Sequence, residues 1–322
     1  MSPLQGIHHV TAIASDPQKN VDFYSALLGL RLVKKTVNFD DPGSYHLYYG
    51  DRSGTPGSIV TFFSWPSAAP GQIGAGEPVA LGLAIPPGSR DWWRERLEAA
   101  GFHPVDAGHR LGEPVLSVLD PDRLTVELVE HTPSSESPSR TSFWAEGPIP
   151  EAYAVTAIHS VTLSHSGKTQ EAADLFHELT FGAAGYDADA LRKRYSVGTG
   201  SSQGFVDIAP APTSRRGRVG AGTIHHVAFR TEDDASQLDW QQSLLTLGLH
   251  VSPVMDRNYF HSIYFREPGG VLFEIATDPP GFAVDEPESH LGESLKLPSW
   301  YESIRPSLET SLPKLVTPKG TA

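Results

Sequence analysis

The sequence predicts an α+β fold in which one βαβββ unit is repeated four times. The first observation is that an apolar, strand-like run followed by an amphipathic helix occurs at four places in the 322 residues. The second is that short strands separated by turn residues follow these helices. The third bears on function, because two of the units open with a doubled histidine, His8 and His9 in one and His225 and His226 in the other.

The four openings align when they are placed side by side. They read HHVTAIASDPQKNVDFYSALLGLRLV from His8, VALGLAIPPGSRDWWRERLEAAGF from Val79, HSVTLSHSGKTQEAADLFHELTFGA from His159 and HHVAFRTEDDASQLDWQQSLLTLGLHV from His225. A glycine that suits a helix C-cap follows each helix, at Gly29, Gly101, Gly182 and Gly248. In the first helix, Val21, Tyr24 and Leu28 recur at helical spacing.

Three strands are expected after each helix. In the first unit they cover residues 30–39, 45–49 and 58–65, and in the fourth unit 250–254, 261–265 and 271–276. The stretch 133–154 is rich in Ser, Pro and Glu, which is typical of a linker. The predicted organisation is an N-terminal half with units one and two (1–133), a linker (134–154), a C-terminal half with units three and four (155–280) and a tail with little regular structure (281–322).

Composition excludes several classes of protein. The net charge of −13 argues against nucleic acid or an anionic membrane as a partner, because both attract basic surfaces. The N-terminal stretch MSPLQGIHHV has no basic and apolar signal pattern, so a cytoplasmic location is expected. The absence of cysteine leaves only nitrogen and oxygen as ligands for any metal ion.

Two polar residues stand inside apolar runs that read as core strands. They are His226, in GTIHHVAF, and Glu274, in LFEIATD, 48 residues later (274 − 226). Burying such groups costs several kcal/mol unless they are paired or bound to a metal. His9, in the matching string GIHHVTAI, offers a third ligand. The pattern therefore predicts a metal site made of two histidines and one glutamate.

Each unit can be inspected at two corresponding places. The second position of the opening pair is His9 in unit one, an apolar or small residue in unit two, Ser160 in unit three and His226 in unit four. The position six residues after the proline that precedes the last strand is Phe62, Glu127 and Glu274 in units one, two and four, and Asp207 matches it in unit three. Two ligand sets remain open on these grounds, since His226 and Glu274 could be completed by His9 or by Asp207.

The remaining polar candidates have simpler interpretations. Alternation along LTVELVE would point Glu127 toward water, and His159 aligns with His8 rather than His9, so both are expected to be structural. The other histidines are expected on the surface or in packing positions: His46, His103, His109, His131, His165, His177 and His290.

Four long stretches resemble the vicinal oxygen chelate (glyoxalase/bleomycin resistance/dioxygenase) superfamily, in particular its branch of ring-cleaving hydroquinone dioxygenases. They are GIHHVTAIASDPQKNVDFYSALLGLRLVKKTVNFDDP, GTIHHVAF, RNYFHSIYFREPGGVLFEIATDPPGF and LPSWYESIRPSLETSLP. The resemblance covers the whole chain. It implies two half-barrels of paired modules, with unit one packed against unit four, and it favours His9, His226 and Glu274 as ligands of Fe(II), with Mn(II) as the other possibility.

The resemblance also implies roles for neighbouring residues. Tyr264, His225 and His8 would be catalytic, and Thr11 and Arg257 would bind the substrate, although strand alternation points His8 and His225 away from the ligand face. The implied reaction is extradiol-type cleavage of a small 1,4-dihydroxylated aromatic substrate by O2, in a possible homo-oligomer. The alternatives are a catechol substrate, a glyoxalase-like isomerase or thiol transferase, and a metal-free protein that binds aromatic compounds.

Overall fold

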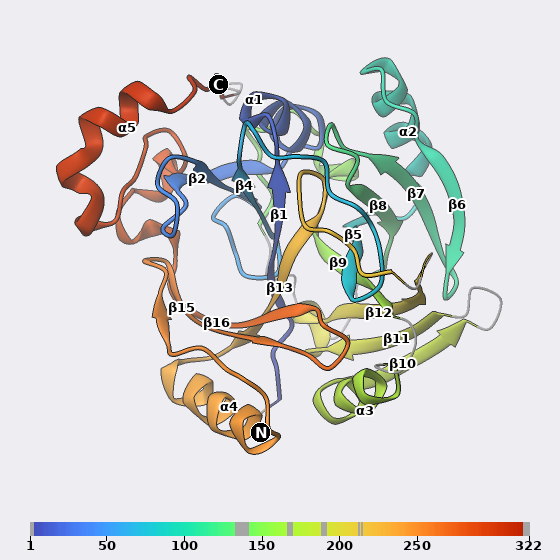
Figure 1. The fold of residues 1–322 in the computed structure, drawn as a ribbon. Coiled ribbons are helices and arrows are strands. Elements are labelled where there is room, and N and C mark those ends of the chain that lie inside the picture. Colours follow the sequence, from blue (N-terminus) through green and yellow to red (C-terminus); the bar gives the residue numbers. More distant parts are fainter. Residues whose placement is uncertain are drawn as a thin grey trace.

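The structure is a computed structural model that describes residues 3–132, 142–165, 170–187, 192–211, 213 and 215–317. Two large, curled sheets occupy the centre, and the helices lie around them (Figure 1). No helix in these ranges combines the length and the apolar character that a membrane span requires.

The first sheet joins the first and the fourth units. Its strands, in spatial order, are β14 (Met255–Asp256), β15 (Phe260–Arg266), β16 (Leu272–Pro280), β13 (Ile224–Thr231), β1 (Ile7–Ala14), β4 (Ile59–Ser64), β3 (Tyr45–Gly50) and β2 (Arg31–Val37). β1 and β13 run antiparallel at its centre, and Val10 pairs with Val227. The predicted packing of unit one against unit four is confirmed.

The second sheet joins the second and third units in the same way. Its strands, in spatial order, are β10 (Gly182–Asp187), β11 (Arg192–Val197), β12 (Gly204–Pro210), β9 (Ala157–His165), β5 (Glu77–Ile85), β8 (Thr125–Glu130), β7 (Glu113–Leu119) and β6 (Val105–Arg110). Leu81 pairs with Val161 at its centre. The boundaries of two consecutive halves stay a prediction, and residues 134–141 of the predicted linker lie outside the described residues.

One continuous hydrophobic core connects the two sheets. The central pairs Val10–Val227 and Leu81–Val161 are fully buried members of it. All eight residues of β1 are buried, because this strand is covered on both faces. A polar side chain on β1 or β13 is therefore held in a desolvated environment, which is the setting that makes a charged or imidazole group there costly without a partner.

The helices follow the predicted spacing with one irregularity. They are α1 (Pro17–Val21), α2 (Arg90–Ala99), α3 (Gln170–Thr180), α4 (Asp234–Thr246) and α5 (Arg305–Ser311). Asp16 caps α1 by accepting from the backbone N–H groups of Gln18 and Lys19. α1 continues into a π-helical turn, η1 (Asp22–Leu27), in which the consecutive residues Phe23, Tyr24 and Ser25 are all buried. This single π-helical turn is the irregularity in the first helix.

Two expectations about regular structure were wrong. The strand expected at 250–254 is reduced to a single bridge between Val251 and Phe265, and the short β14 follows after Pro253, which has no N–H group for a sheet hydrogen bond. The tail contains α5 and short 3-10 helices, and it packs against β2 and the loop after it (Figure 1). The ion pairs of Lys34 with Asp285 and Glu286 anchor it. Among the described residues, the 3-10 helices are η2 (Glu151–Tyr153), η4 (Gly200–Ser202), η5 (Phe282–Val284), η6 (Glu288–His290) and η7 (Ser299–Ile304).

Candidate metal centre

Three of the predicted residues converge at the centre of the first sheet. His9 Nε2 lies 3.3 Å from His226 Nε2 and 3.3 Å from the Oε2 atom of Glu274, and His226 Nε2 lies 2.9 Å from that same oxygen. All three side chains are buried. The structure thus brings together one carboxylate oxygen and two imidazole nitrogens from β1, β13 and β16, in an arrangement that could hold a metal ion.

The strand register explains why these residues meet. Around the Val10–Val227 pair, Thr11 lies opposite His226 and His9 lies opposite Ala228, so the two histidines occupy equivalent places in units one and four. β16 runs parallel to β13 and sets Glu274 beside Ala228. Asp207, the alternative ligand in the sequence, lies in β12 of the other sheet.

The position that corresponds to Glu274 in unit one is Thr61, which corrects the prediction of Phe62. Glu274 pairs with Ala228, and the equivalent residue Thr11 pairs with Thr61. Counting from a proline gave the wrong residue because the turn before β4 is one residue shorter. Phe62 points to the opposite face, where its ring packs 4.4 Å from that of Tyr24.

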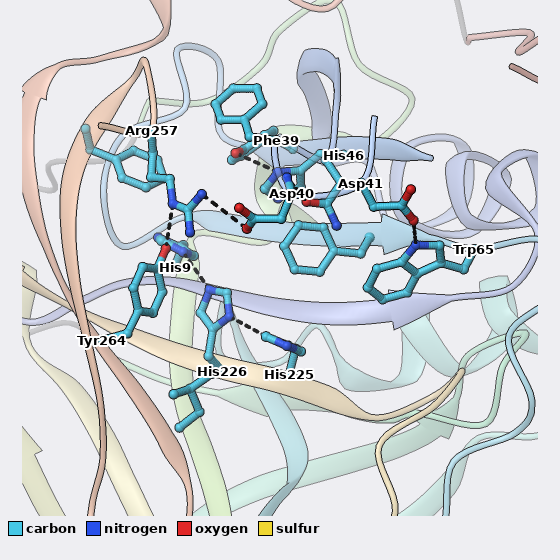
Figure 2. A pocket seen from close by; sticks show the side chains of 15 residues that line it. His9, Phe39, Asp40, Asp41, His46, Trp65, His225, His226, Arg257 and Tyr264 are labelled. Carbon is cyan, nitrogen blue, oxygen red and sulfur yellow. Dashed lines mark hydrogen bonds and ion pairs between the residues drawn. The ribbon is translucent and has the colours of Figure 1, made fainter. Parts of the chain in front are cut away.

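Each of the two histidines is held by the histidine that precedes it. His8 Nδ1 lies 2.9 Å from His9 Nδ1, and His225 Nδ1 lies 2.8 Å from His226 Nδ1 (Figure 2). If Nε2 of His9 and His226 binds a metal, Nδ1 carries the proton and donates it to the neighbour, which orients the ring. Irregularities in the β1–β13 pairing allow adjacent side chains to meet in this way. Burial and the adjacent His226 lower the pKa of His225 to about 3, so its ring is neutral.

The carboxylate of Glu274 has the properties expected of a metal ligand. Ser262 donates a short hydrogen bond to Oε1, whereas Oε2 has no hydrogen-bond partner in the described part of the chain. Burial opposes ionisation, but His9 and His226 hold the pKa of Glu274 well below its usual range. A buried carboxylate oxygen facing two imidazole nitrogens fits a divalent transition-metal ion.

A cavity of about 360 Å³ opens beside these residues (Figure 2). Its walls are largely aromatic and include Phe39, Tyr48, Phe63, Trp65, Phe260 and Tyr264. Apolar walls with a few convergent polar groups are typical of a site for a small organic ligand. His46 was expected on the surface or in packing, but it lines this cavity. In the strand register, His46 and Tyr48 of unit one correspond to Ser262 and Tyr264 of unit four. The two-residue spacing places both members of each pair on the same face of their strand, and this spacing is the sequence signal that could have identified His46 and Tyr48 as cavity residues.

Arg257 and Tyr264 line the cavity next to the metal site. Arg257 Nε donates to the Tyr264 hydroxyl over 3.1 Å, and Arg257 Nη1 lies 3.4 Å from Asp40 (Figure 2). Burial and the charge of Glu274 raise the pKa of Tyr264 well above its usual range, so the hydroxyl keeps its proton. His225 lines the same cavity, whereas His8 and Thr11 are not among the residues that line it.

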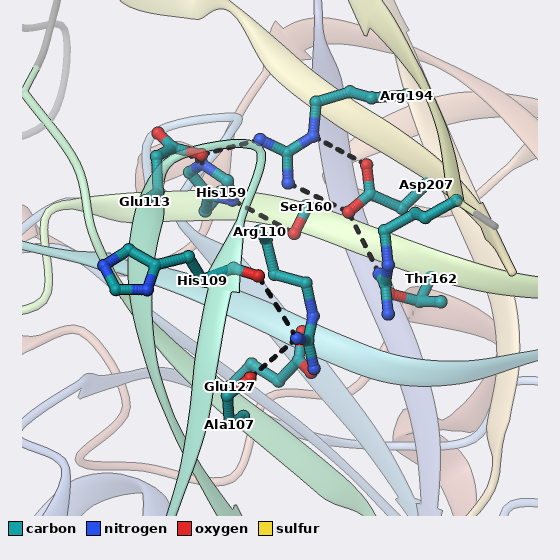
Figure 3. Close-up of polar contacts among 11 residues, drawn as sticks. Ala107, His109, Arg110, Glu113, Glu127, His159, Ser160, Thr162, Arg194 and Asp207 are labelled. Atoms are coloured by element: carbon teal, nitrogen blue, oxygen red, sulfur yellow. Dashed lines mark hydrogen bonds and ion pairs between the residues drawn. The ribbon is translucent and has the colours of Figure 1, made fainter. Parts of the chain in front are cut away.

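In the second sheet, the acidic residues at the positions that correspond to Glu274 form ion pairs with arginines. Glu127 and Asp207 occupy the positions that match Glu274, but Ala80 and Ser160 stand where the first sheet has histidines. Arg110 pairs with Glu127, and Arg194 makes a bidentate pair with Asp207 (Figure 3). The prediction that Glu127 faces water was wrong, because the Glu127 side chain is buried against Arg110.

A second group of potential ligands lies near these ion pairs. Glu113, His131 and His159 approach one another closely. Arg194 already contacts the Glu113 carboxylate at 2.6 Å, and both histidines contact its other oxygen. The group is therefore neutralised and hydrogen-bonded without a metal ion. His159 also contacts Ser160 Oγ at 3.0 Å, which supports the structural role predicted for it.

Comparison with known proteins identifies the family of this chain. The family model of the Glyoxalase/Bleomycin resistance protein/Dioxygenase superfamily matches residues 6–128 and 166–275. The chain is 44% identical over 308 residues to MhqO of Bacillus subtilis (strain 168), provisionally named a ring-cleaving dioxygenase, with 95% of each protein covered. It is 32% identical over 315 residues to a chlorohydroquinone/hydroquinone 1,2-dioxygenase of Sphingobium indicum, again with 95% of each covered.

A crystal structure gives the same result for the fold. It is of a Bacillus subtilis protein provisionally described as a dioxygenase, and it matches with a TM-score of 0.89 and 42% identity over 99% of this chain and 100% of that chain. The predicted α+β architecture of paired βαβββ modules, the vicinal oxygen chelate fold, is confirmed. With nearly the full length matched at this identity, the chain belongs to the Glyoxalase/Bleomycin resistance protein/Dioxygenase superfamily.

Proposed function

We propose that this protein is an Fe(II)-dependent dioxygenase that opens the ring of a hydroquinone-type, 1,4-dihydroxylated aromatic compound with O2. The carrying observation is that His9, His226 and Glu274 converge beside an aromatic-walled cavity. Two histidines and one carboxylate form the ligand set of non-heme Fe(II) oxygenases, which keep open positions for substrate and O2. The names of MhqO and of the Sphingobium indicum enzyme support the reaction class.

The protein's own residues would bind and orient the ring. When bound, Fe(II) would hold the substrate and O2 side by side and would pass electron density from the electron-rich ring to O2. The aromatic walls hold the ring and exclude water. Because the two hydroxyl groups of a 1,4-diol are not adjacent, the ring opens beside one hydroxylated carbon, which is an extradiol-type outcome.

Two proton donors would stabilise an anionic oxygen of the substrate. The Tyr264 hydroxyl accepts from Arg257 Nε, so its own proton is free to point toward the cavity. When Nε2 of His226 binds the metal, its Nδ1–H group would donate to Nδ1 of His225, and the proton of the neutral His225 ring would then reside on Nε2. Donors positioned where negative charge develops lower the barrier without reorganisation of the site.

Oxygen uptake by protein loaded anaerobically with Fe(II) tests the proposal. Hydroquinones, catechols and no substrate are offered in parallel, and a second sample carries Mn(II). Uptake with hydroquinones, in equal amount to a ring-opened product, is expected from Fe(II)-loaded protein and not from its His9→Ala variant. Oxygen uptake only with catechols would show that the substrates are catechols and not hydroquinones. No uptake despite bound metal would favour a glyoxalase-like isomerase or transferase. The cytoplasmic location and a homo-oligomeric state stay predictions of the sequence.

A further inference from the structure

The C-terminal tail carries a motif that the proposed reaction leaves without a role. This stretch, LPSWYESIRPSLETSLP at residues 297–313, is one of the four that carry the resemblance to the superfamily. The structure describes all of it, yet it supplies no member of the candidate metal centre and no residue that lines the cavity. Because the tail packs against β2 and the loop after it, this loop is the element through which the tail can affect the site (Figure 1).

The loop after β2 forms one wall of the cavity. Its four consecutive residues Asn38, Phe39, Asp40 and Asp41 all line the cavity. The backbone N–H group of Asn38 donates to the carbonyl group of Ser44 over 2.9 Å, which closes the base of the loop. Residues 39–41, at the tip of the loop, belong to no strand. Contacts with other segments therefore determine where this wall stands.

Three segments of the chain hold the tip of this loop. Arg257, between β14 and β15, has Nη1 3.4 Å from Oδ2 of Asp40 (Figure 2). Trp65, directly after β4, donates from Nε1 to Oδ2 of Asp41 over 2.6 Å (Figure 2). The third segment is the tail, which contacts Phe39, the aromatic member of this wall. Each residue of the tip thus has its own support, and the tail provides the one for Phe39.

Two neighbouring tail residues contact Phe39 in different ways. The hydroxyl group of Tyr301 donates to the backbone carbonyl group of Phe39 over 2.9 Å. The ring of Trp300 meets the ring of Phe39 edge to face, with centroids 5.7 Å apart and an angle of 80° between the planes, which is a favourable geometry for an aromatic pair. Trp300 is itself 50% exposed, so burial alone does not explain its place. Tyr301 fixes the backbone of Phe39, and Trp300 limits the movement of its ring.

Buried side chains fix the tail on both sides of this pair. Leu297 precedes the pair and Leu308 follows it, and both are buried members of the main hydrophobic core. The backbone N–H group of Lys296 also donates to the carbonyl group of Lys35 in β2 over 2.9 Å. A side chain can position a neighbouring loop only when its own backbone is held in place, and the tail meets this condition.

We infer that Trp300 and Tyr301 are positioning residues of the substrate site, which act through Phe39 and limit the size of the ring substituents that the cavity admits. The inference rests on the proposed function for the class of substrate. Neither residue lines the cavity, so neither is itself catalytic. The competing explanation is that the tail only stabilises the fold, in which case tail substitutions would leave the loop and the choice of ligand unchanged.

Two variants and one matched control separate these explanations. Tyr301→Phe removes the hydroxyl group that bonds to Phe39, and Trp300→Ala removes the ring that packs against it. Tyr45→Phe is the control, because the Tyr45 hydroxyl group donates to the carbonyl group of Pro313 over 2.9 Å. This bond also joins the tail to unit one, but neither of its partners lines the cavity.

Anaerobic titration calorimetry of Fe(II)-loaded protein measures binding without turnover, with hydroquinone and the bulkier tert-butylhydroquinone as ligands. Tyr301→Phe should weaken hydroquinone binding about three- to tenfold, the effect of one lost hydrogen bond, whereas Tyr45→Phe should stay within about twofold of wild type. Trp300→Ala should raise the affinity for tert-butylhydroquinone relative to hydroquinone at least about threefold, because the Phe39 ring can then retreat. A general loss of stability would not change this ratio of two affinities.

Amide hydrogen exchange of metal-free protein follows the loop without any ligand. Residues 38–44 should exchange at least about threefold faster in Tyr301→Phe than in Tyr45→Phe. Equal hydroquinone binding and equal loop exchange in these two proteins would overturn the inference, and an unchanged preference between the two ligands in Trp300→Ala would refute the size limit. If wild-type protein binds neither ligand, the proposed substrate class fails, and the exchange of the loop then decides the inference by itself.

Discussion

Replacing Tyr264 by phenylalanine isolates one hydroxyl group at the candidate active site. The hydroxyl lies in an aromatic cavity and accepts a 3.1 Å hydrogen bond from Arg257, while its own proton remains available to a substrate oxygen. Removing one positioned donor from a developing anion costs about 2–4 kcal/mol, so kcat/KM should fall roughly 30- to 900-fold. Metal content should not change, because Tyr264 is not one of the three ligands.

Tyr48 provides the matched control for this experiment. It occupies the corresponding position in unit one, lines the same cavity, and has its hydroxyl 2.9 Å from His46 Nδ1. Tyr48→Phe removes the same atom but leaves the Arg257–Tyr264 contact intact, so we expect a loss of less than about tenfold. Oxygen-uptake kinetics of Fe(II)-loaded wild type and both variants make the comparison. Equal losses in the two variants, or a Tyr264→Phe enzyme within twofold of wild type, would refute the assigned role.

Three further predictions concern the metal, pH and the support behind the site. Glu274→Gln should lower the affinity for Fe(II) at least about tenfold in anaerobic titration, because the anionic ligand is lost; unchanged affinity would exclude Glu274 as a ligand. The pKa of His225 is about 3 in the folded protein, below the pKa of about 6.5 for a histidine in the unfolded chain. Between these two pH values the unfolded chain binds more protons than the folded protein does. The free energy of unfolding should therefore fall as the pH drops from about 6.5 toward 3. Melting temperatures of metal-free protein should show this decline, and His225→Asn should show less of it. Gln237→Leu should lower the free energy of unfolding in urea by about 2–4 kcal/mol, because the buried Gln237 amide donates to the backbone carbonyl groups of His261 and Ile275. A loss under about 1 kcal/mol would contradict this account.

The three candidate ligands could be found in the sequence because they violate the apolar pattern of core strands. His9, His226 and Glu274 each interrupt a run that must be buried, and the repeat places His9 and His226 at equivalent positions of units one and four. Their choice over Asp207 came from family resemblance, since spacing alone left both sets open. Strand pairing separates the two sets in space, because Asp207 lies in the other sheet, where Arg194 neutralises it.

Register and long-range partners were beyond the sequence. Whether Thr61 or Phe62 corresponds to Glu274 depends on a turn that is one residue shorter, and a shift of one residue moves a side chain to the opposite face of a sheet. Glu127 is buried because Arg110, from a different strand, folds over it. His46 faces the cavity only because β3 lies beside β4.

The repeated unit, the class of fold and the residue types of the candidate ligands can be derived from the sequence, because burial and periodicity act locally along the chain. The tertiary structure decided which units share a sheet, which residues complete each polar site and where the cavity lies. The buried group of His165, His177 and Glu267 illustrates this limit. Its members are 12 and 90 residues apart in the chain (177 − 165 and 267 − 177), and only the packing of α3 and the β15–β16 turn between the sheets brings them together.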